Sequence, residues 1–305
     1  MPPPAVTIGI PCYNSEEWLR PCLESALAQS GVDAEIIVVD DGSTDRSVEI
    51  AREFGDAVRL IEAPHRGANH ARNEILRAAR GEWIQHLDAD DFLLPDKITR
   101  QLREVRPADA DIIYSPVWIE QNSERAASPL DTMLDLPAQW LSWQLPQTGG
   151  CLWRKSALQQ LGGWNEAMPC CQEHELYLRA IRAGCRFVHA RTPGAVYRIW
   201  SEGTLCRKDP RLVVSVKTRL IDDLRAWMIE RGRWTWKHAH IAGQACFEMA
   251  RTLARYDLAE AAAYHRERQE RELIHLNGPA APRAYAVAYR TLGFSAAERL
   301  AAAKR

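Results

Sequence analysis

Two clusters of carboxylates stand in the first hundred residues, each directly after an apolar run. Residues 35–39 lead into Asp40-Asp41-Gly42-Ser43-Thr44-Asp45, and residues 83–87 lead into Asp88-Ala89-Asp90-Asp91. A short apolar run bounded by turn residues predicts a buried strand, so both clusters should emerge at strand ends. In an open α/β sheet, ligands bind at that edge. Gathered carboxylates repel one another unless a cation or a donor-bearing ligand stabilises them, so the pattern predicts a metal and nucleotide site.

The second cluster has the order Asp-x-Asp. Alternate residues of an extended segment point the same way, so Asp88 and Asp90 should face one ligand while Asp91 turns elsewhere. Mg²⁺ and Mn²⁺ take oxygen ligands, often one or two carboxylates with substrate phosphates completing the shell. The alternative interpretation is a solvated acidic turn, because this pattern is common.

The segment 65–73 places two arginines, Arg66 and Arg72, at a predicted junction of loop and helix. Helix N-termini and guanidinium groups both favour phosphate. Arg72 by itself would equally suit an exposed helix position. Together with the acidic clusters, the segment favours a phosphate-bearing ligand.

Strand and helix signals alternate through the first two thirds of the chain, which predicts an α/β fold with a mostly parallel sheet. The predicted strands are 6–10, 35–40, 58–61, 83–87, 112–117 and 187–189. The predicted helices are one capped by Asn14 or Ser15, one over 44–54 capped by Ser43 or Thr44, one over 68–80 ended by Gly81 as C′ residue, one over 156–161 ended by Gly162-Gly163, and one over 172–183.

Helical composition without a convincing strand follows Pro210. The predicted helices there are 211–231, 234–256, 257–275 and 283–304. We therefore expect a domain over 1–209, with a nucleotide-binding half 1–118 and an acceptor-binding half 119–209. A helical C-terminal region over 210–305 would follow it.

Composition excludes several classes of protein. The 305 residues carry a formal net charge of -1, so no global field recruits nucleic acid. The eight cysteines form no C-x-x-C pair, which favours reduced thiols in a cytoplasmic protein. Met1-Pro2-Pro3-Pro4 has no basic or apolar leader pattern, and no apolar stretch approaches the roughly 18 residues of a membrane span. We expect a soluble protein, at most peripheral at the inner face of the membrane.

The motifs together make the chain resemble family 2 glycosyltransferases, which have the GT-A (Rossmann-like) fold. The resemblance is close over residues 5–95 and continues more weakly to about residue 205. The matching motifs are Pro11-Cys12-Tyr13-Asn14, Val38-Val39-Asp40-Asp41-Gly42-Ser43, Gly67 with Ala71-Arg72-Asn73, Gly81-Glu82-Trp83-Ile84 and Leu87-Asp88-Ala89-Asp90-Asp91.

The resemblance implies a role for each matching position. Asp40 would accept a hydrogen bond from the nucleotide base, and Asp90 would coordinate the divalent metal, Mn²⁺ or Mg²⁺. That metal would bridge the two phosphates of the donor and neutralise charge on the departing diphosphate. The implied nucleotide-binding residues are Pro11, Tyr13, Asn14, Asp40, Arg72 and Asp88.

The same resemblance implies a catalytic base. Relatives place it in an acidic pair written ED-x-x-L-x-x-R, and the matching segment here runs from Gln172 to Arg179. Glu173 falls on the base position. Glu175 lies about 200° further round a helix, so the two carboxylates should not reach one hydroxyl. The alternative for either residue is a helix N-terminal acid stabilised by the macrodipole.

Further segments match those that flank the acceptor site in relatives. The implied contacts to donor or acceptor sugar are Gly149, Gly150, Trp164 and Glu175. Trp153 and Trp164 would either stack on sugar faces or belong to the core. Three departures stand out: Gln172 replaces the first acid, Glu173 replaces the commoner Asp at the base position, and Trp200 stands where many relatives have a metal-binding His. Since tryptophan cannot ligate the metal, a third ligand would come from elsewhere, for example His189.

We therefore predict an inverting, metal-dependent glycosyltransferase that moves a sugar from a nucleotide-sugar, a UDP-sugar, to a hydroxyl acceptor. The acceptor would be a glycan, a lipid-linked molecule or a protein, in bacterial cell-surface polysaccharide synthesis. One alternative is a catalytically idle nucleotide-sugar-binding module. Another is a phosphohydrolase with a nucleophile in the 40–43 turn, although that class has the order Asp-x-Asp-Gly-Thr after its first strand.

The helical tail gathers basic residues and tryptophans between Trp227 and His238. This composition suits a membrane surface, where lipid-linked acceptors reside. Helix packing with solvated charges is the other interpretation.

Overall fold

The computed structural model describes residues 4–199 and 209–303. The chain divides into two compact units: Met1–Leu130 with Leu145–Ser201, and Asp131–Gln144 with Glu202–Arg305. Residues 131–144, which the sequence analysis grouped with the acceptor-binding half, thus fall in the helical unit. The predicted domain boundary at residue 209 stays a prediction, because residues 200–208 lie outside the described part of the chain.

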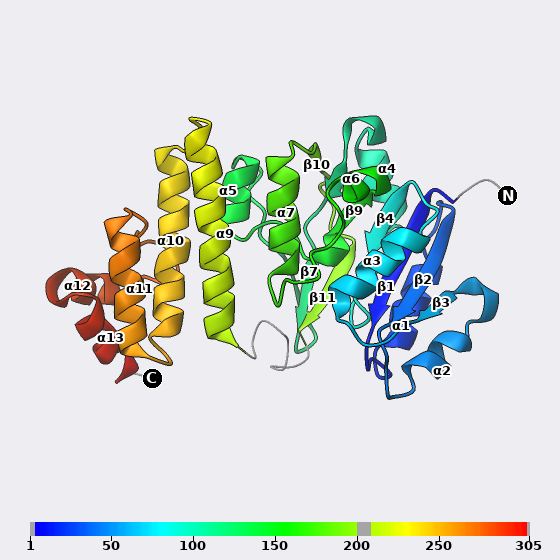
Figure 1. The fold of residues 1–305 in the computed structure, drawn as a ribbon, viewed down its shortest axis with the longest axis horizontal. Coiled ribbons are helices and arrows are strands. Elements are labelled where there is room, and N and C mark those ends of the chain that lie inside the picture. The colour runs from blue at the N-terminus through cyan, green and yellow to red at the C-terminus, as the bar shows by residue number, and fades with distance from the viewer. Residues whose placement is uncertain (1–3, 200–208, 304–305) are drawn as a thin grey trace. The chain divides into compact units, whose positions relative to one another are not determined.

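A seven-stranded sheet forms the centre of the first unit (Figure 1). Its order is β10 (Phe187–His189), β6 (Ile112–Tyr114), β9 (Cys151–Arg154), β4 (Trp83–His86), β1 (Val6–Cys12), β2 (Ala34–Asp40) and β3 (Arg59–Glu62). Only β9 runs antiparallel to its two neighbours, β4 and β6. The predicted α/β class with a mostly parallel sheet is therefore confirmed.

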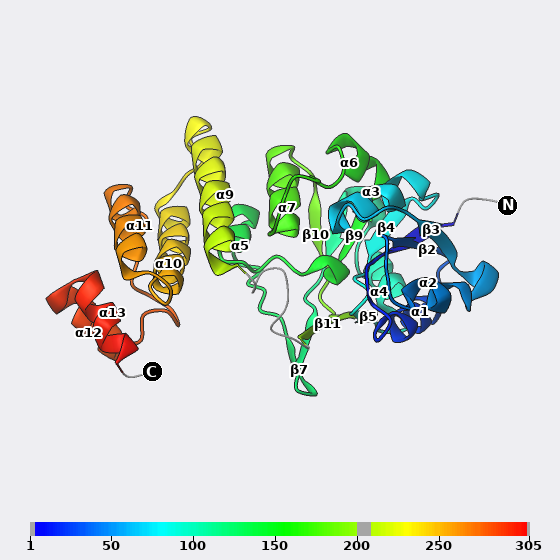
Figure 2. The same ribbon diagram turned by 60° about the horizontal axis from the view of Figure 1, so that its bottom comes forward.

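Helices cover both faces of this sheet. Figure 2 shows α3 (Ala68–Ala78), α6 (Lys155–Gln160) and α7 (Gln172–Arg182) over one face, and α1 (Leu19–Leu27), α2 (Ser47–Arg52) and α4 (Lys97–Glu104) over the other. Strand β2 is buried on both sides because its side chains alternate. Ile37 and Val39 pack with α3, whereas Ile36 and Val38 join the opposite core.

A second, four-stranded sheet has the order β5 (Phe92–Leu93), β11 (Ala195–Ile199), β7 (Trp118–Gln121) and β8 (Glu124–Ala127). Strand β5 directly follows the second acidic cluster and pairs antiparallel with β11. This sheet ties the acidic turn to a strand a hundred residues later in the chain. Short 3₁₀ turns, η1 (Gly55–Ala57), η2 (Pro107–Asp109) and η3 (Thr148–Gly150), complete the unit.

The first two helices begin later than the sequence predicts. Ser15 was a predicted N-cap, but its backbone N–H donates to Ser47 Oγ, and helix α1 starts only at Leu19. Helix α2 starts at Ser47, whose N–H donates to Asp45 Oδ1, so neither Ser43 nor Thr44 caps it. At α1 the acceptor comes from a neighbouring segment, and at α2 it is the side chain two residues earlier, so the predicted capping residues are not used.

Gly81 follows α3 but is not the left-handed C′ residue that was predicted. A Cβ at this position would lie 2.4 Å from the backbone nitrogen of Thr7. Glycine is therefore needed because the chain passes close to β1, and not because of its φ angle.

In its described residues, the second unit contains helices and no strand. It contains α5 (Leu136–Leu141), α9 (Pro210–Glu230), α10 (Trp236–Leu253), α11 (Leu258–Glu270), α12 (Arg283–Leu292) and α13 (Phe294–Ala302). Helix α10 packs against α5, α9 and α11. The single helix predicted over 283–304 is two helices, because Gly293 takes a φ of 78° between them. None of the helices in the described ranges has the length and apolar character to cross a bilayer.

Candidate active site

Both acidic clusters lie at one edge of the main sheet. In the parallel registers, Cys12 at the end of β1 pairs with Asp40, and Gly9 pairs with His86 at the end of β4. Leu87, just past β4, still donates its N–H to Gly9. The carboxyl ends of three neighbouring strands, labelled in Figure 1, therefore converge, as the sequence predicts.

Asp40 is buried at the end of β2 with only one of its oxygens used. Its Oδ2 accepts from the backbone N–H groups of Gly42 at 3.1 Å and Ser43 at 3.0 Å. Its Oδ1 is buried and has no hydrogen-bond partner among the residues that the structure describes. A buried carboxylate oxygen without a donor is costly, so this atom is suited to a ligand N–H.

The loop after β1 lies against the turn after β2. Asn14 takes a φ of 45°, donates its N–H to Ser43 Oγ at 2.9 Å, and accepts from Thr44 N at 2.8 Å. Tyr13 is half exposed and stacks on the His65 ring, with centroids 4.2 Å apart. Pro11 is buried within β1. This arrangement leaves the Tyr13 ring as a half-exposed aromatic surface, one residue past the Cys12–Asp40 pair.

Asp41 has a structural role that the sequence analysis did not assign. Its Oδ1 accepts from Arg66 N at 2.8 Å, and its Oδ2 accepts from Gly67 N at 2.7 Å. The His65 ring also contacts this carboxylate at 2.9 Å. Asp41 therefore anchors the loop that leads into α3. Two adjacent aspartates after a strand point in different directions, and this pattern could have indicated that Asp40 and Asp41 have different roles.

Arg72 is buried and joins segments from three parts of the chain. It donates to Asp88 Oδ1 at 2.7 Å and to Gln172 Oε1 at 3.0 Å, and its guanidinium lies 4.6 Å from the Trp164 ring centroid. Burial acts to lower the pKa of Arg72, but the nearby carboxylates of Asp88 and Glu173 raise it overall. Its Nε is buried without a partner in the described chain.

Asp88, Asp90 and Asp91 separate in the turn after β4. Asp88 pairs with Arg72, whereas Asp91 is buried and accepts from the backbone N–H of Arg198 at 2.9 Å. Burial, and then the charges of Asp90 and Asp88, raise the pKa of Asp91 well above its usual range. The Arg198 side chain donates to the Asp90 carbonyl and lies over Trp18. Asp91 thus turns away from Asp88, as predicted.

The carboxylates fit a metal that uses few protein ligands. Within residues 4–199 and 209–303, no three His, Cys, Asp or Glu side chains converge as a metal site. Asp88 and Asp90 are half-buried hard oxygen donors, a set that Mg²⁺ and Mn²⁺ accept when phosphate and water complete the shell. The Trp200 position lies outside the described residues.

His189 does not supply the third ligand considered above. It lies on β10, three positions from β4 in the sheet order, which corresponds to roughly 14 Å at the usual strand spacing. Its ring contacts Tyr114 on β6. The strand order therefore separates His189 from Asp90.

The two acids at the start of α7 have different partners. Glu173 Oε1 accepts from Thr148 Oγ1 at 2.8 Å. Both oxygens of Glu175 are held by Arg179, with N–O distances of 2.8 Å. Gln172, the residue before Glu173, accepts from Arg72. The first turn of α7 therefore brings Glu173 next to the acidic edge, while Glu175 is tied to its own helix.

The predicted sugar-site glycines are buried. A Cβ at Gly150 would lie 2.7 Å from Pro146 Cβ and 2.8 Å from the Ser115 carbonyl oxygen, so close packing requires glycine there. Gly149 is buried beside it and accepts from Gln85 Nε2 at 3.0 Å. A contact of either residue with a sugar stays a prediction.

The two tryptophans considered as sugar platforms are also buried. The Arg72 guanidinium stacks over the Trp164 ring. Trp164 also donates its Nε1–H to His86 Nε2 at 3.2 Å, and this acceptor role requires a neutral imidazole. Burial and then the charge of Arg72 lower the pKa of His86 to about 3, in agreement with that role. Trp153 stacks on Tyr177, with centroids 5.8 Å apart. Trp164 is 4% exposed and has Arg72 on its ring, so a contact with a sugar stays a prediction.

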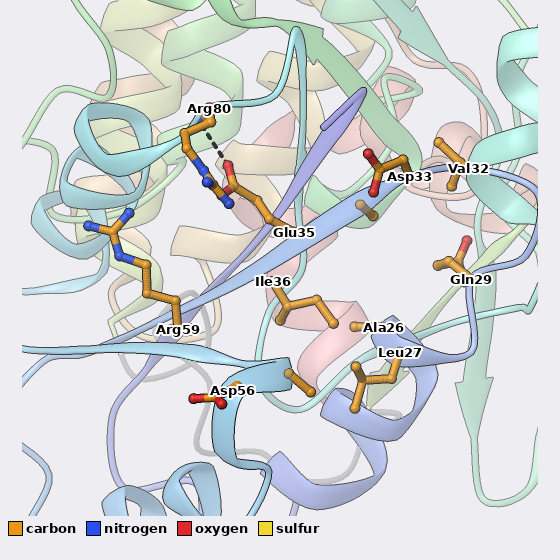
Figure 3. A pocket seen from close by; sticks show the side chains of 12 residues that line it. Ala26, Leu27, Gln29, Val32, Asp33, Glu35, Ile36, Asp56, Arg59 and Arg80 are labelled. Atoms are coloured by element: carbon orange, nitrogen blue, oxygen red, sulfur yellow. Dashed lines mark hydrogen bonds and ion pairs between the residues drawn. The ribbon is translucent and has the colours of Figure 1, made fainter. Parts of the chain in front are cut away.

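A cavity of about 520 Å³ lies at the opposite end of β2 (Figure 3). Its lining includes Glu35 and Arg80, which form an ion pair at 2.8 Å, and Arg59. Glu35 also accepts from Thr7 Oγ1 at 2.6 Å. None of its lining residues belongs to the two acidic clusters, so this cavity is separate from the candidate active site.

Comparison with known proteins agrees with this geometry. A sequence model described as "Glycosyl transferase family 2" matches residues 7–162. An uncharacterized glycosyltransferase of Rickettsia felis is 31% identical over 191 residues, which cover 59% of this chain and 32% of that protein. A chondroitin synthase of Escherichia coli is 31% identical over 189 residues, which cover 59% of this chain and 27% of that protein. The chain thus spans about a third of the length of these relatives.

Two solved structures share the fold. S. aureus TarS 1–349 in complex with UDP-GlcNAc superposes with a TM-score of 0.60 over 94% of this chain and 91% of that one, at 13% identity. A mannosyltransferase from Pyrobaculum calidifontis in complex with GDP-Man and Mn²⁺ superposes with a TM-score of 0.57. The match covers 99% of this chain and 86% of that one, at 18% identity. At such identities the likeness establishes the fold alone.

Proposed function

Because this chain belongs to glycosyl transferase family 2 and has the GT-A fold, we propose that it is an inverting, metal-dependent glycosyltransferase. The donor is a nucleotide-sugar, a UDP-sugar, and the acceptor is a hydroxyl group of a glycan, a lipid-linked molecule or a protein. The process is bacterial-type cell-surface polysaccharide synthesis. The chondroitin synthase relative and the neighbours holding UDP-GlcNAc and GDP-Man support this proposal.

One observation carries the proposal. Arg72 is bonded both to Asp88, in the acidic turn, and to Gln172, in the first turn of α7. The acidic turn, which is suited to a metal-bound diphosphate, and the carboxylate of Glu173 therefore both lie near the buried guanidinium of Arg72. A transferase needs this neighbourhood, because the leaving diphosphate and the attacking hydroxyl act on the same anomeric carbon.

The nucleotide binds at the carboxyl edge of β1, β2 and β4. Asp40 Oδ1 accepts the N–H of the base, which provides the donor that this buried oxygen lacks in the described chain. The loop from Pro11 to Asn14 lies beside the base and ribose, with Tyr13 as a stacking surface. Asp88 accepts from the ribose, and Arg72 faces the diphosphate.

Transfer proceeds by one displacement. The acceptor oxygen forms a bond to the anomeric carbon as the bond from that carbon to the diphosphate oxygen breaks, and its electron pair leaves with the nucleoside diphosphate. Glu173 accepts the proton of the acceptor hydroxyl. Attack from the face opposite the leaving group inverts the configuration.

Asp90 would hold the divalent cation through its carboxylate, which is a hard oxygen donor. When bound, the cation neutralises the negative charge that develops on the departing diphosphate. Arg198 orients this turn through its bond to the Asp90 carbonyl. Arg72 adds a fixed positive charge on the same side.

We place the protein in the cytoplasm, with the turn between α9 and α10 in contact with the inner face of the membrane. In this turn Arg231 and Arg233 are exposed and lie 4.9 and 5.7 Å from the Trp227 ring centroid. Trp236 is 76% exposed, and Lys237 follows it. Exposed cations interleaved with tryptophan suit an anionic phospholipid surface.

The test begins with thermal unfolding in the presence of UDP, GDP and CDP, with and without Mn²⁺, because a ligand that binds only the folded state raises its stability. The nucleotide that binds then defines a set of donor sugars, and release of the nucleoside diphosphate is measured with hydroxyl acceptors. We expect UDP release that needs Mn²⁺ and stops with EDTA. Tight UDP binding without turnover on any acceptor would instead identify an idle binding module.

A further inference from the structure

A buried lysine lies behind the candidate active site, where the proposed mechanism does not use it. Lys97 is the first residue of α4, is 1% exposed, and donates from Nζ to Gln85 Oε1 on β4. The Nζ group can donate to this oxygen whether or not it carries the extra proton, so the contact orients the Gln85 amide. The amide Nε2 must then point the other way, toward the Gly149 carbonyl at 3.0 Å.

A second buried amide holds the next carbonyl of the same turn. Gln101 Nε2 donates to the Gly150 carbonyl at 2.9 Å and to Ser115 Oγ at 3.0 Å. The backbone N–H of Ser115 also donates to Gly150, at 3.1 Å. The turn η3 is therefore held from its buried side at two consecutive carbonyl groups.

The other side of η3 meets helix α7. Thr148, which opens the turn, is buried and donates from Oγ1 to Glu173 Oε1 at 2.8 Å. One helical turn later, Tyr177 donates from its hydroxyl to the Pro146 carbonyl at 2.8 Å. Two side chains on one face of α7 are thus attached to the segment that Gln85 and Gln101 hold in place.

We propose that Thr148 is a positioning residue for Glu173. The Thr148 hydroxyl occupies Oε1 and fixes the rotamer of the carboxylate, so that Oε2 is the oxygen presented to the acceptor hydroxyl. Gln85, oriented by Lys97, keeps the turn that carries Thr148 at this distance. This inference rests on the proposed function, because it assumes that Glu173 is the base.

The test compares Thr148→Val, which removes the hydroxyl and keeps the shape, with Thr148→Ser, which keeps the hydroxyl. Thr291→Val, on exposed α12 outside the site, is the matched control. We expect Thr148→Val to lower kcat about tenfold, the usual effect of losing a hydrogen bond to a charged group, while KM for the donor stays unchanged. Thr148→Ser and Thr291→Val should keep the wild-type kcat.

UDP-induced thermal stabilisation reports whether each variant is folded, and Thr148→Ala replaces Thr148→Val if the valine variant fails to fold. A double variant, Thr148→Val with Glu173→Gln, should be no slower than Glu173→Gln alone, since the hydroxyl would act only through the carboxylate. Wild-type kcat in a folded variant without the hydroxyl, or no rescue by serine, would overturn the inference. Full transfer by Glu173→Gln would instead overturn the base assignment in the proposed function.

Discussion

Arg179 holds both carboxylate oxygens of Glu175, with Nε and Nη2 each 2.8 Å from an oxygen. The guanidinium also donates to the Leu161 carbonyl at 2.6 Å, so this pair attaches α7 to the end of α6. Glu173, two residues earlier, has its contact with Thr148 on the site side. The two acids of the motif therefore differ in what they can do.

This difference predicts unequal effects of two matched substitutions. Glu173→Gln should lower kcat by at least about 100-fold with the donor KM unchanged, because it removes the proton acceptor. Glu175→Gln should lower the melting temperature but change kcat by less than about tenfold, because it breaks an ion pair that stabilises the helix. Steady-state kinetics and thermal unfolding of both variants provide the measurement. The reverse ranking in kcat would assign the base to Glu175.

Asp90 should control the metal dependence. In Asp90→Asn we expect Mn²⁺-stimulated transfer to fall about 100-fold or more, since the charge that holds the cation against the diphosphate is lost. Asp56→Asn, on exposed η1, is the control. Rates are measured against Mn²⁺ concentration, and an unchanged metal response in Asp90→Asn would remove this residue from the metal site.

Asp40 should control affinity for the nucleotide base. Its Oδ1 is buried without a partner in the described chain, whereas Oδ2 is used by the turn. Asp40→Asn keeps one oxygen that can accept from the turn, but it replaces the carboxylate oxygen that would accept from the base. We therefore expect UDP to bind about 10- to 100-fold more weakly. Calorimetric titration with UDP, again with Asp56→Asn as control, measures this. Equal UDP affinity would mean that Asp40 serves the turn alone.

Lys97 should make stability depend on pH in a recognisable way. Burial lowers its pKa from 10.5 to about 7, so between these values the unfolded chain binds a proton that the folded chain does not. The wild-type free energy of unfolding therefore gains about 1.4 kcal/mol per pH unit from this group as the pH rises from 7 to 10. Below pH 7 the lysine is charged in both states, so its burial lowers the free energy of unfolding by the full amount.

Lys97→Met has similar length and cannot become charged. Its stability relative to the wild type should be most favourable at pH 7 and should fall steadily toward pH 10. Urea unfolding of both proteins across this range gives the difference, in which other titrating groups cancel. A difference that does not vary with pH would show that Lys97 keeps its usual pKa.

The turn between α9 and α10 should bind anionic membranes. Arg233→Ala combined with Lys237→Ala should lower the affinity for phosphatidylcholine–phosphatidylglycerol vesicles about 30-fold, as measured by co-sedimentation. The reason is that each basic residue near such a surface contributes about 1 kcal/mol to the binding free energy. Arg266→Ala with Arg290→Ala, exposed on α11 and α12, is the matched control. Equal sedimentation of the two double variants would leave this turn without a membrane role.

Local sequence pattern was sufficient for the strands and helices that form the acidic edge. The apolar runs before Asp40 and Asp88 are strands β2 and β4, and the expected parallel sheet brings their ends together. The pattern predicted them because burial on both faces requires continuous apolar residues, a property that is local in sequence. Two helix starts were wrong. Ser15 binds Ser47 in a neighbouring segment, and Asp45 accepts at the start of α2 in place of the predicted Ser43 or Thr44.

The types of chemical group and their order along the chain were thus determined by the sequence alone. The tertiary structure decided which groups are already engaged: Glu175 by Arg179, Trp164 by Arg72, and Asp41 by the loop before α3. It also decided that residues 131–144 belong with the helical unit. Arg72 and Gln172 are separated by 100 residues and yet share a hydrogen bond. Such a contact depends on how whole helices pack on the sheet, which no local spacing of residues contains.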